Sequence, residues 1–134
     1  MSSRTSHGHP LALLVTHGTL GQELVRTVER ILGHQTGVLT LSNDDLSAEG
    51  LRSAIEERVG ETPASQPVVL FSDLAAGSCG VASRRVAVEG RVIRCISGVN
   101  LPMLLEFFHY RETMPLDELM TRLEMKGKAG IVTF

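Results

Sequence analysis

Short apolar runs alternate with longer amphipathic stretches along most of this chain. A strand that is covered on both faces is apolar throughout, so each short run predicts a buried strand. The predicted strands cover residues 11–15, 38–41, 68–71 and 92–96, and the closing A-G-I-V-T-F predicts one more short strand. These runs supply the strands of a sheet whose middle is buried on both sides.

The stretches between the runs carry apolar residues at helical spacing, which predicts amphipathic helices. Signals at the helix ends agree: Ser47 can cap a helix, and Pro102 and Pro115 stand where helices begin. Gly33 and Gly127 stand where helices are expected to stop. The predicted helices cover residues 21–32, a stretch from Ser47 to residue 59, residues 78–88, a stretch beginning at Pro102, and residues 115–127.

The alternation of strands and helices at these lengths predicts right-handed crossovers and a mainly parallel sheet. The expected fold class is therefore α/β, with one domain over residues 11–134. In such sheets a ligand binds beyond the carboxyl ends of the strands, where the strand order reverses. The segments to inspect are thus T-H-G after the first strand, S-N-D-D after the second, S-D-L-A-A-G-S after the third and S-G-V-N after the fourth.

The composition and the apolar patterning argue against several classes of protein, namely nucleic-acid-binding, membrane-spanning and secreted proteins. The chain is 43% hydrophobic with a formal net charge of −2, which is typical of a compact domain and supplies no basic surface for nucleic acid. No apolar stretch approaches the roughly 20 residues of a membrane span, and residues 11–15 are too short for the core of a secretory signal. We therefore expect a cytoplasmic protein without nucleic-acid partners. Residues 1–10, M-S-S-R-T-S-H-G-H-P, are expected to be a flexible lead-in.

Two candidate catalytic residues, His17 and Asp73, stand directly after the first and third predicted strands. With a strand order of 2-1-3-4 these strands are neighbours, so the two side chains could meet at one rim of the sheet. A carboxylate that accepts a hydrogen bond from one imidazole nitrogen fixes the tautomer and leaves the lone pair of the other nitrogen free as a nucleophile. Thr16 and Gly18 flank the histidine with a hydroxyl and an uncrowded backbone.

The segment A-A-G-S-C-G after Asp73 is made of small residues and leads into a predicted helix. Backbone N–H groups at a helix N-terminus are unpaired and bind anions such as phosphate, so Gly77 and Ser78 are candidate phosphate-binding residues. A histidine nucleophile, a carboxylate and an anion cradle together favour phosphoryl transfer through a phosphohistidine. A structural role stays open for His17 and Asp73, because a histidine at a strand end is more often structural and an aspartate there often caps a turn.

Two other functions are compatible with the sequence. Cys79 and Arg85 match C-x5-R, the phosphate loop of cysteine-dependent phosphatases, in which a thiolate and an arginine hold the phosphate. That loop should follow its strand directly, whereas Cys79 lies six positions beyond Asp73, so we expect Cys79 to be a packing residue and Cys95 to lie in the core. The second alternative is a non-enzymatic flavodoxin-like module that binds an anion at the same rim.

Three motifs follow one another along the chain: L-L-V-T-H-G, F-S-D-L-A-A-G-S-C-G-V-A-S-R and S-G-V-N-L-P-M-L-L-E. By these motifs, in this order, the chain resembles the IIA domain of the mannose family of the bacterial phosphoenolpyruvate-dependent sugar phosphotransferase system. The resemblance covers the chain from about residue 11 to residue 134. The resemblance implies a flavodoxin-like fold and a homodimer in which an antiparallel C-terminal strand, here G-I-V-T-F, is exchanged between subunits. It also implies that the protein needs no metal and no cofactor.

The resemblance further implies a phosphotransferase in which His17 takes a phosphoryl group from phospho-HPr and passes it to a IIB domain, while Asp73 orients the histidine. Any association with the membrane would be indirect, through a IIC/IID transporter. The residues expected to bind phosphate or to border the site are Thr16, Gly18, Gly77, Ser78, Asn100 and Pro102.

One loop departs from the family pattern. The family usually has D-T-W-G-G-S-P after its third strand, where this chain has D-L-A-A-G-S-C. The departure leaves open an alternative role as a regulatory IIA protein that accepts phosphate without serving a transporter. The residues do not indicate a sugar.

Overall fold

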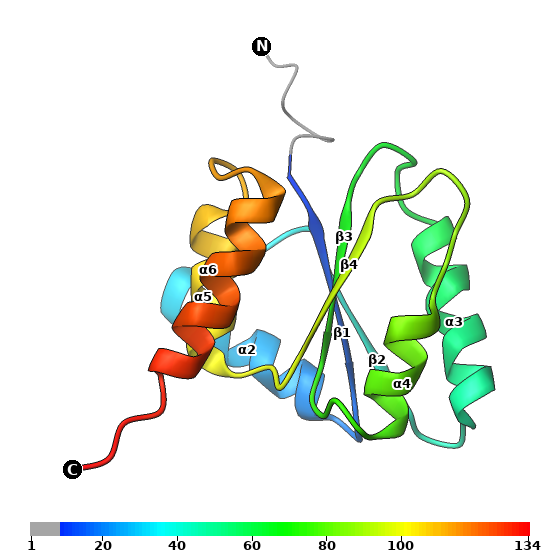
Figure 1. Ribbon diagram of the computed structural model, residues 1–134, viewed down its shortest axis with the longest axis horizontal. Coiled ribbons are helices and arrows are strands. Elements are labelled where there is room, and N and C mark those ends of the chain that lie inside the picture. Colours follow the sequence, from blue (N-terminus) through cyan, green and yellow to red (C-terminus); the bar gives the residue numbers. More distant parts are fainter. Residues whose placement is uncertain (1–8) are drawn as a thin grey trace.

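The computed structural model describes residues 9–134, which form a central β-sheet with helices on both of its faces (Figure 1). Residues 1–8, most of the predicted lead-in, lie outside the described residues. The strands are β1 (Leu11–Thr16), β2 (Val38–Ser42), β3 (Val68–Ser72) and β4 (Ile93–Ser97). The helices are α2 (Leu20–Leu32), α3 (Ala48–Gly60), α4 (Ser78–Arg85), α5 (Leu101–Tyr110) and α6 (Leu116–Ala129).

The sheet is parallel throughout, with its strands in the order β2-β1-β3-β4. This confirms the predicted fold class and the strand order 2-1-3-4. Thr16 at the end of β1 pairs with Ser42 of β2, and Ser72 at the end of β3 pairs with Ser97 of β4. All four strands therefore end at one rim, and the strand order reverses there between β1 and β3, which is where open α/β sheets bind ligands.

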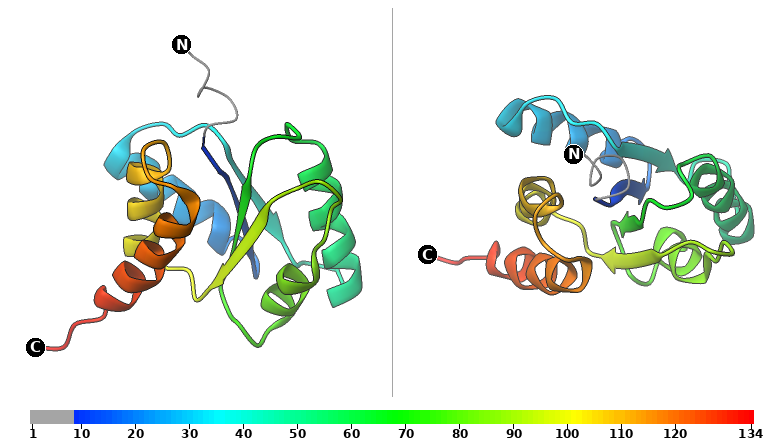
Figure 2. Two further views of the ribbon diagram at one scale, coloured as in Figure 1. Left: turned by 45° about the horizontal axis from the view of Figure 1, so that its top comes forward. Right: turned by 90° about the horizontal axis from the view of Figure 1, so that it is seen from above.

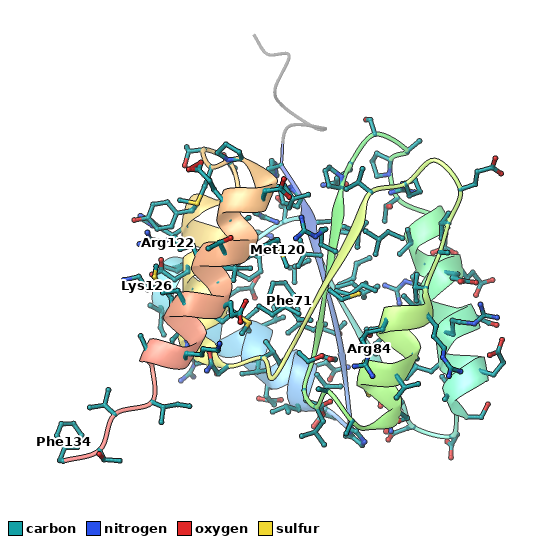
Figure 3. The ribbon with its side chains drawn as sticks, in the orientation of Figure 1. Phe71, Arg84, Met120, Arg122, Lys126 and Phe134 are labelled. Carbon is teal, nitrogen blue, oxygen red and sulfur yellow. The ribbon has the colours of Figure 1, made fainter. Side chains whose placement is uncertain are left out.

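Two hydrophobic cores cover the two faces of the sheet, because successive strand residues point to opposite sides. Leu14 and Phe71 belong to the core beneath α2, α5 and α6, whereas Leu13 and Leu70 belong to the core beneath α3 and α4. Figure 2 shows these two helical layers on either side of the strands. Phe71, labelled in Figure 3, meets Phe107 of α5 edge to face at 5.1 Å between ring centroids, a favourable geometry for aromatic pairs.

Two of the predicted helices, α3 and α5, begin with side-chain capping hydrogen bonds. The Ser47 side chain accepts a hydrogen bond of 3.0 Å from the Gly50 N–H and caps α3. Asn100 accepts one of 3.0 Å from the Met103 N–H, and Pro102 occupies the first turn of α5. No helix within residues 9–134 is both long enough and apolar enough to cross a bilayer.

Two predicted boundaries differ from the structure near α4. This helix ends at Arg85 and not at residue 88, because Val86 adopts an extended conformation with φ −66° and ψ 132°. The chain leaves the helix here so that Val86 packs on the core beneath α3 and α4, and the Ala87 N–H donates to Glu56 at 3.0 Å. The following strand is displaced by one residue, to Ile93–Ser97.

Gly127 does not end its helix as predicted, since α6 continues through it to Ala129. A Cβ atom at Gly127 would lie 2.9 Å from Cε of Met103, so the glycine lets α6 approach α5 closely. The Gly127 carbonyl also accepts a hydrogen bond of 2.9 Å from the Asn100 side chain. Gly127, which the sequence analysis interpreted as a helix end, is therefore a residue that allows α5 and α6 to pack closely.

The predicted core position of Cys95 is wrong, because Cys95 is exposed. Its strand, β4, lies at the edge of the sheet, so side chains there have a neighbouring strand on one side only. Residues 131–134 form no strand in the single chain and extend away from α6 (Figure 1). Exchange of this segment between two subunits stays a prediction.

Candidate functional site

His17 is presented by the sharp turn between β1 and α2. Gly18 has a φ of +55°, a left-handed conformation that glycine adopts without strain. The turn is held from below by Thr16, which is buried and whose hydroxyl accepts a hydrogen bond of 2.8 Å from the Gly21 N–H. The His17 side chain is therefore left about half exposed at the rim, at 47% of its full area.

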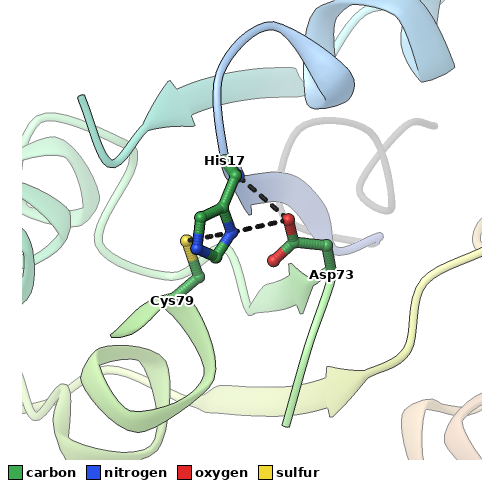
Figure 4. A group of neighbouring side chains, drawn as sticks. All are labelled: His17, Asp73 and Cys79. Atoms are coloured by element: carbon green, nitrogen blue, oxygen red, sulfur yellow. Dashed lines mark hydrogen bonds and ion pairs between the residues drawn. The ribbon is translucent and has the colours of Figure 1, made fainter. Parts of the chain in front are cut away.

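Asp73 lies beside His17 at the end of β3, as the strand order predicts. Its Oδ2 atom is 2.9 Å from the His17 backbone nitrogen and 2.9 Å from Nδ1 of the ring (Figure 4). The Asp73 side chain is nine-tenths buried, with 10% of its area exposed. The sequence-predicted pair thus meets directly, with the carboxylate beside Nδ1 of the ring.

The electrostatics of this pair favour an ionised carboxyl group. Burial by itself raises the pKa of Asp73, but hydrogen bonds from the His17 backbone and ring outweigh burial and bring this pKa below its ordinary value. An ionised carboxylate can only accept hydrogen bonds, so Nδ1 of His17 carries a proton. In a neutral ring the lone pair is then on Nε2, the nitrogen that can act as a nucleophile.

The N-terminus of α4 faces the same ring. Gly77 is the N-cap of α4 and, having no side chain, accepts no capping hydrogen bond from the first N–H groups of the helix. A Cβ atom at Gly77 would lie 3.4 Å from Cε1 of His17, so the helix start is beside the ring carbon that lies between Nδ1 and Nε2. The first N–H groups of a helix have no partner within it and attract anions. The structure therefore brings Gly77 next to His17, and Ser78 follows Gly77 as the first residue of α4.

The loop between β3 and α4 is held in place from two sides. Arg84 of α4 donates a hydrogen bond of 2.7 Å from Nη1 to the Ala75 carbonyl oxygen. Gly80 approaches the loop so closely that a Cβ atom there would lie 2.2 Å from the Leu74 carbonyl oxygen. Arginine at the end of a short helix and glycine in its first turn thus fix the loop that follows Asp73.

Asn43 is a site residue that sequence reasoning did not identify. Its side-chain amide donates to Oγ of Ser78 at 3.4 Å, and its backbone N–H donates to the Thr16 carbonyl at 3.1 Å. Its position in the S-N-D-D segment after β2, at the rim, was the available signal. Asn43 links the ends of three elements around the ring.

Cys79 packs beneath His17, which the sequence did not indicate either. Its Sγ atom lies 3.8 Å from Nδ1 of the ring, and the residue is fully buried in the core beneath α3 and α4. Burial, followed by the nearby Asp73 carboxylate, raises the pKa of Cys79 to about 11. A buried, protonated thiol is a poor nucleophile, and Arg85 is exposed at the far end of the same helix. This geometry does not support the cysteine phosphatase alternative.

Asn100 and Pro102 lie where α5 begins and touch α6. Both polar atoms of the Asn100 side chain are engaged, with Met103 and with the Gly127 carbonyl. Pro102 packs so closely that a Cβ atom at Gly130 would lie 2.7 Å from its Cγ. The preceding loop joins the rim, because the Val99 N–H donates to the Ser72 carbonyl at 3.0 Å. No hydrogen bond joins either residue to His17 within the described chain.

A family model, curated proteins and solved structures all indicate the same family for this chain. Residues 12–124 match the family model described as the PTS system fructose IIA component, EIIA-man. The mannose-specific EIIAB component of the phosphotransferase system from Escherichia coli (strain K12) is 30% identical over 120 residues, which cover 87% of this chain and 36% of that protein. The chain therefore spans about a third of the length of the curated relatives it matches.

Several solved structures share the fold. The EIIA component from Streptococcus agalactiae superposes with a TM-score of 0.83 at 25% identity, covering 92% of this chain and 96% of that one. The mannose/sorbose-specific IIA subunit from Enterococcus faecalis gives a TM-score of 0.78 at 22% identity, covering 94% and 95% of the two chains.

Proposed function

The chain belongs to the mannose-family EIIA components of the sugar phosphotransferase system, and from this membership we propose that it carries a phosphoryl group on Nε2 of His17. The group arrives from phospho-HPr and leaves to a IIB domain. The sequence resemblance to this family is thereby confirmed, and EIIA components are phosphotransferases in general.

The observation that carries the proposal is the double contact between His17 and Asp73, both at 2.9 Å. The Nε2 lone pair attacks the phosphorus on the donor, and a new N–P bond forms as the donor's N–P bond breaks. The electron pair of the broken bond returns to the donor imidazole. The His17 ring then holds a positive charge with its proton still on Nδ1, and the Asp73 carboxylate stabilises that charge. No proton has to move during the transfer.

The phosphoryl oxygens would lie against the N-terminus of α4. The donors would be the backbone N–H groups of Gly77 and Ser78 and the Ser78 hydroxyl, since a Cβ atom at Gly77 would lie 3.4 Å from Cε1 of the ring, and Gly18 would contribute an uncrowded backbone. The positive end of the helix dipole adds to this attraction. Thr16 acts indirectly, since its hydroxyl supports the turn that presents His17.

The protein surface around the ring would be the docking face for HPr and the IIB domain, with the loop containing Asn100 and Pro102 on its border. Two chains would associate by exchanging residues 131–134 across the free edge of β4. The protein would act in the cytoplasm and meet the membrane only through a IIC/IID transporter. The phosphoryl group already arrives activated, so this role requires no cofactor.

The proposal is tested by incubating the protein with phosphoenolpyruvate, enzyme I and HPr and measuring its intact mass. We expect one acid-labile, base-stable phosphoryl group per chain, and none in His17→Ala. His109→Ala is the matched control, because His109 is also exposed but lies on α5. Phosphorylation of His17→Ala, or none of the unmodified protein, would overturn the proposal. Subsequent transfer to a IIB domain would distinguish a transporter component from a regulatory protein.

A further inference from the structure

Three side chains with different donor atoms converge at His17. Nδ1 of His17 lies 2.9 Å from Oδ2 of Asp73 and 3.8 Å from Sγ of Cys79, and one ligand atom from each residue lies within 4.8 Å of the other two. Figure 4 shows the His17 ring between the other two side chains, both of which contact its Nδ1 atom. Phosphoryl transfer as described above uses the histidine and the aspartate but makes no use of the thiol.

The second carboxylate oxygen of Asp73 has no hydrogen-bond partner among residues 9–134. Oδ1 is buried and makes no hydrogen bond within the part of the chain that the structure describes. A buried polar atom without a hydrogen-bond partner lowers the stability of the fold, and such atoms are rare in native proteins. The Asp73 side chain, nine-tenths buried, therefore offers the cluster both an engaged oxygen and a free one.

We propose that His17, Asp73 and Cys79 form an inhibitory binding site for a thiophilic divalent cation of the zinc class. One nitrogen, one sulfur and one oxygen with a water as fourth ligand is a donor set typical of tetrahedral zinc. In such a site the nitrogen is about 3.4 Å from the oxygen and about 3.6 Å from the sulfur, for the usual bond lengths to zinc. The two distances from the nitrogen therefore need to change by only about half an ångström, and the sulfur and the oxygen, which lie within 4.8 Å of each other, would close to about 3.6 Å.

The donor set also selects against the common hard cations. Magnesium and calcium prefer six or more oxygen ligands, and this cluster offers two carboxylate oxygens with a thiolate and an imidazole. A zinc ion displaces the proton of a coordinating thiol, so the raised pKa of Cys79 does not prevent binding. The thiol proton goes to solvent.

Binding of the cation would block phosphorylation, a consequence that rests on the proposed function. The cation takes the lone pair of Nδ1, so the imidazole proton moves from Nδ1 to Nε2. With a proton on Nε2, the ring has no lone pair with which to attack phosphorus. The hydrogen bond between Asp73 and the ring is lost in the same step. Cation and phosphoryl group therefore exclude each other.

The site is tested first without any phosphorylation, by titrating the full chain with cobalt(II) as a spectroscopic substitute for zinc. All samples carry His7→Ala, because the H-G-H segment offers a competing pair of imidazoles. We expect a thiolate-to-cobalt charge-transfer band that zinc removes. Cys79→Ser should abolish the band and weaken zinc binding by more than the ~10–100-fold that loss of a residue supporting a metal ligand costs, whereas Cys95→Ser, which removes the exposed cysteine, should change neither. Lack of the band in the His7→Ala chain, or its loss in Cys95→Ser, would overturn the proposal whether or not Cys79→Ser folds.

The second arm measures phosphorylation by HPr with and without zinc, each variant against its own zinc-free rate. We expect zinc to inhibit the His7→Ala chain and a chelator to restore its rate. Cys79→Ser in the same mixture should resist zinc, which also shows that enzyme I and HPr are not the target. If cobalt binds but zinc does not inhibit phosphorylation, the cation site exists and its inhibitory role is refuted. If the protein is not phosphorylated even in the absence of zinc, the proposed function is refuted and the cation site is not.

Discussion

One oxygen of Asp73, Oδ2, accepts two hydrogen bonds from His17, one from the backbone N–H and one from ring Nδ1, each 2.9 Å long. The backbone contact joins the ends of β1 and β3 independently of the ring. The ring contact then sets the orientation of the imidazole relative to that fixed point. The carboxylate therefore positions the histidine and selects its tautomer at the same time.

The lowered pKa of Asp73 predicts an acid-sensitive contribution to stability. Because this pKa is lower in the folded protein than in the unfolded chain, the ionised carboxyl stabilises the fold above about pH 4, and the contribution is lost as the pH falls through the folded-state value. Urea unfolding at pH 6 and pH 3 should show a smaller loss of unfolding free energy for Asp73→Asn than for the unmodified protein. Asp44→Asn, at an exposed position, should lose as much as the unmodified protein; equal losses in all three would contradict this account.

Gly80→Ala should disturb the loop that follows Asp73. The added Cβ would lie 2.2 Å from the Leu74 carbonyl oxygen and 2.4 Å from that of Ala75, and neither backbone atom can rotate away. We expect a loss of about 2–3 kcal/mol in unfolding free energy and slower phosphorylation. Gly60→Ala is the control, since its Cβ would meet no atom within 4 Å; a neutral Gly80→Ala would show that the loop adapts freely.

The two cysteines should differ in reactivity toward an alkylating reagent at pH 8. Raising the pKa of Cys79 from 9.0 to about 11 reduces its thiolate fraction by about a hundredfold, and its burial slows access further. Peptide mass mapping after brief labelling should find the label on Cys95 and almost none on Cys79. Denatured protein should label at both positions. Rapid labelling of native Cys79 would revive the phosphatase alternative.

Removal of residues 131–134 should convert the predicted dimer to a monomer. The apolar residues Ile131, Val132 and Phe134 are exposed in the single chain, and the outer edge of β4 has no neighbouring strand within residues 9–134. A strand edge of this kind pairs readily with another chain. Light scattering coupled to size-exclusion chromatography should report a dimer for the full chain and for a chain lacking residues 1–8. A full chain that is monomeric at all concentrations would refute strand exchange.

Much of the fold follows from the sequence because its signals are local. The apolar runs predicted all four strands of the sheet, and the handedness of βαβ crossovers restricts their order. The predictions for Gly127 and Cys95 were wrong because tertiary packing, which a local sequence pattern does not contain, determines the role of each residue. Gly127 resembles a helix stop, yet it allows the close approach of Met103, and Cys95 is exposed on β4, which is an edge strand.

The pairing of His17 with Asp73 could be predicted, since both residues follow strands that the sheet order makes neighbours. The contact of Cys79 with the ring could not, because it depends on how the loop of residues 74–77 turns back over α4. That turn is fixed by the Arg84 contact and by the close approach at Gly80. Sequence patterns carry no direct signal for either interaction.

The central claim is that Asp73 holds Nδ1 of His17 so that Nε2 receives the phosphoryl group. Nitrogen-15 NMR of the phosphorylated protein, labelled at histidine, measures which ring nitrogen is bonded to phosphorus. We predict a phosphorus coupling at Nε2 of His17 with a proton retained on Nδ1. A phosphoryl group on Nδ1 of His17, or on any other residue, would contradict the account.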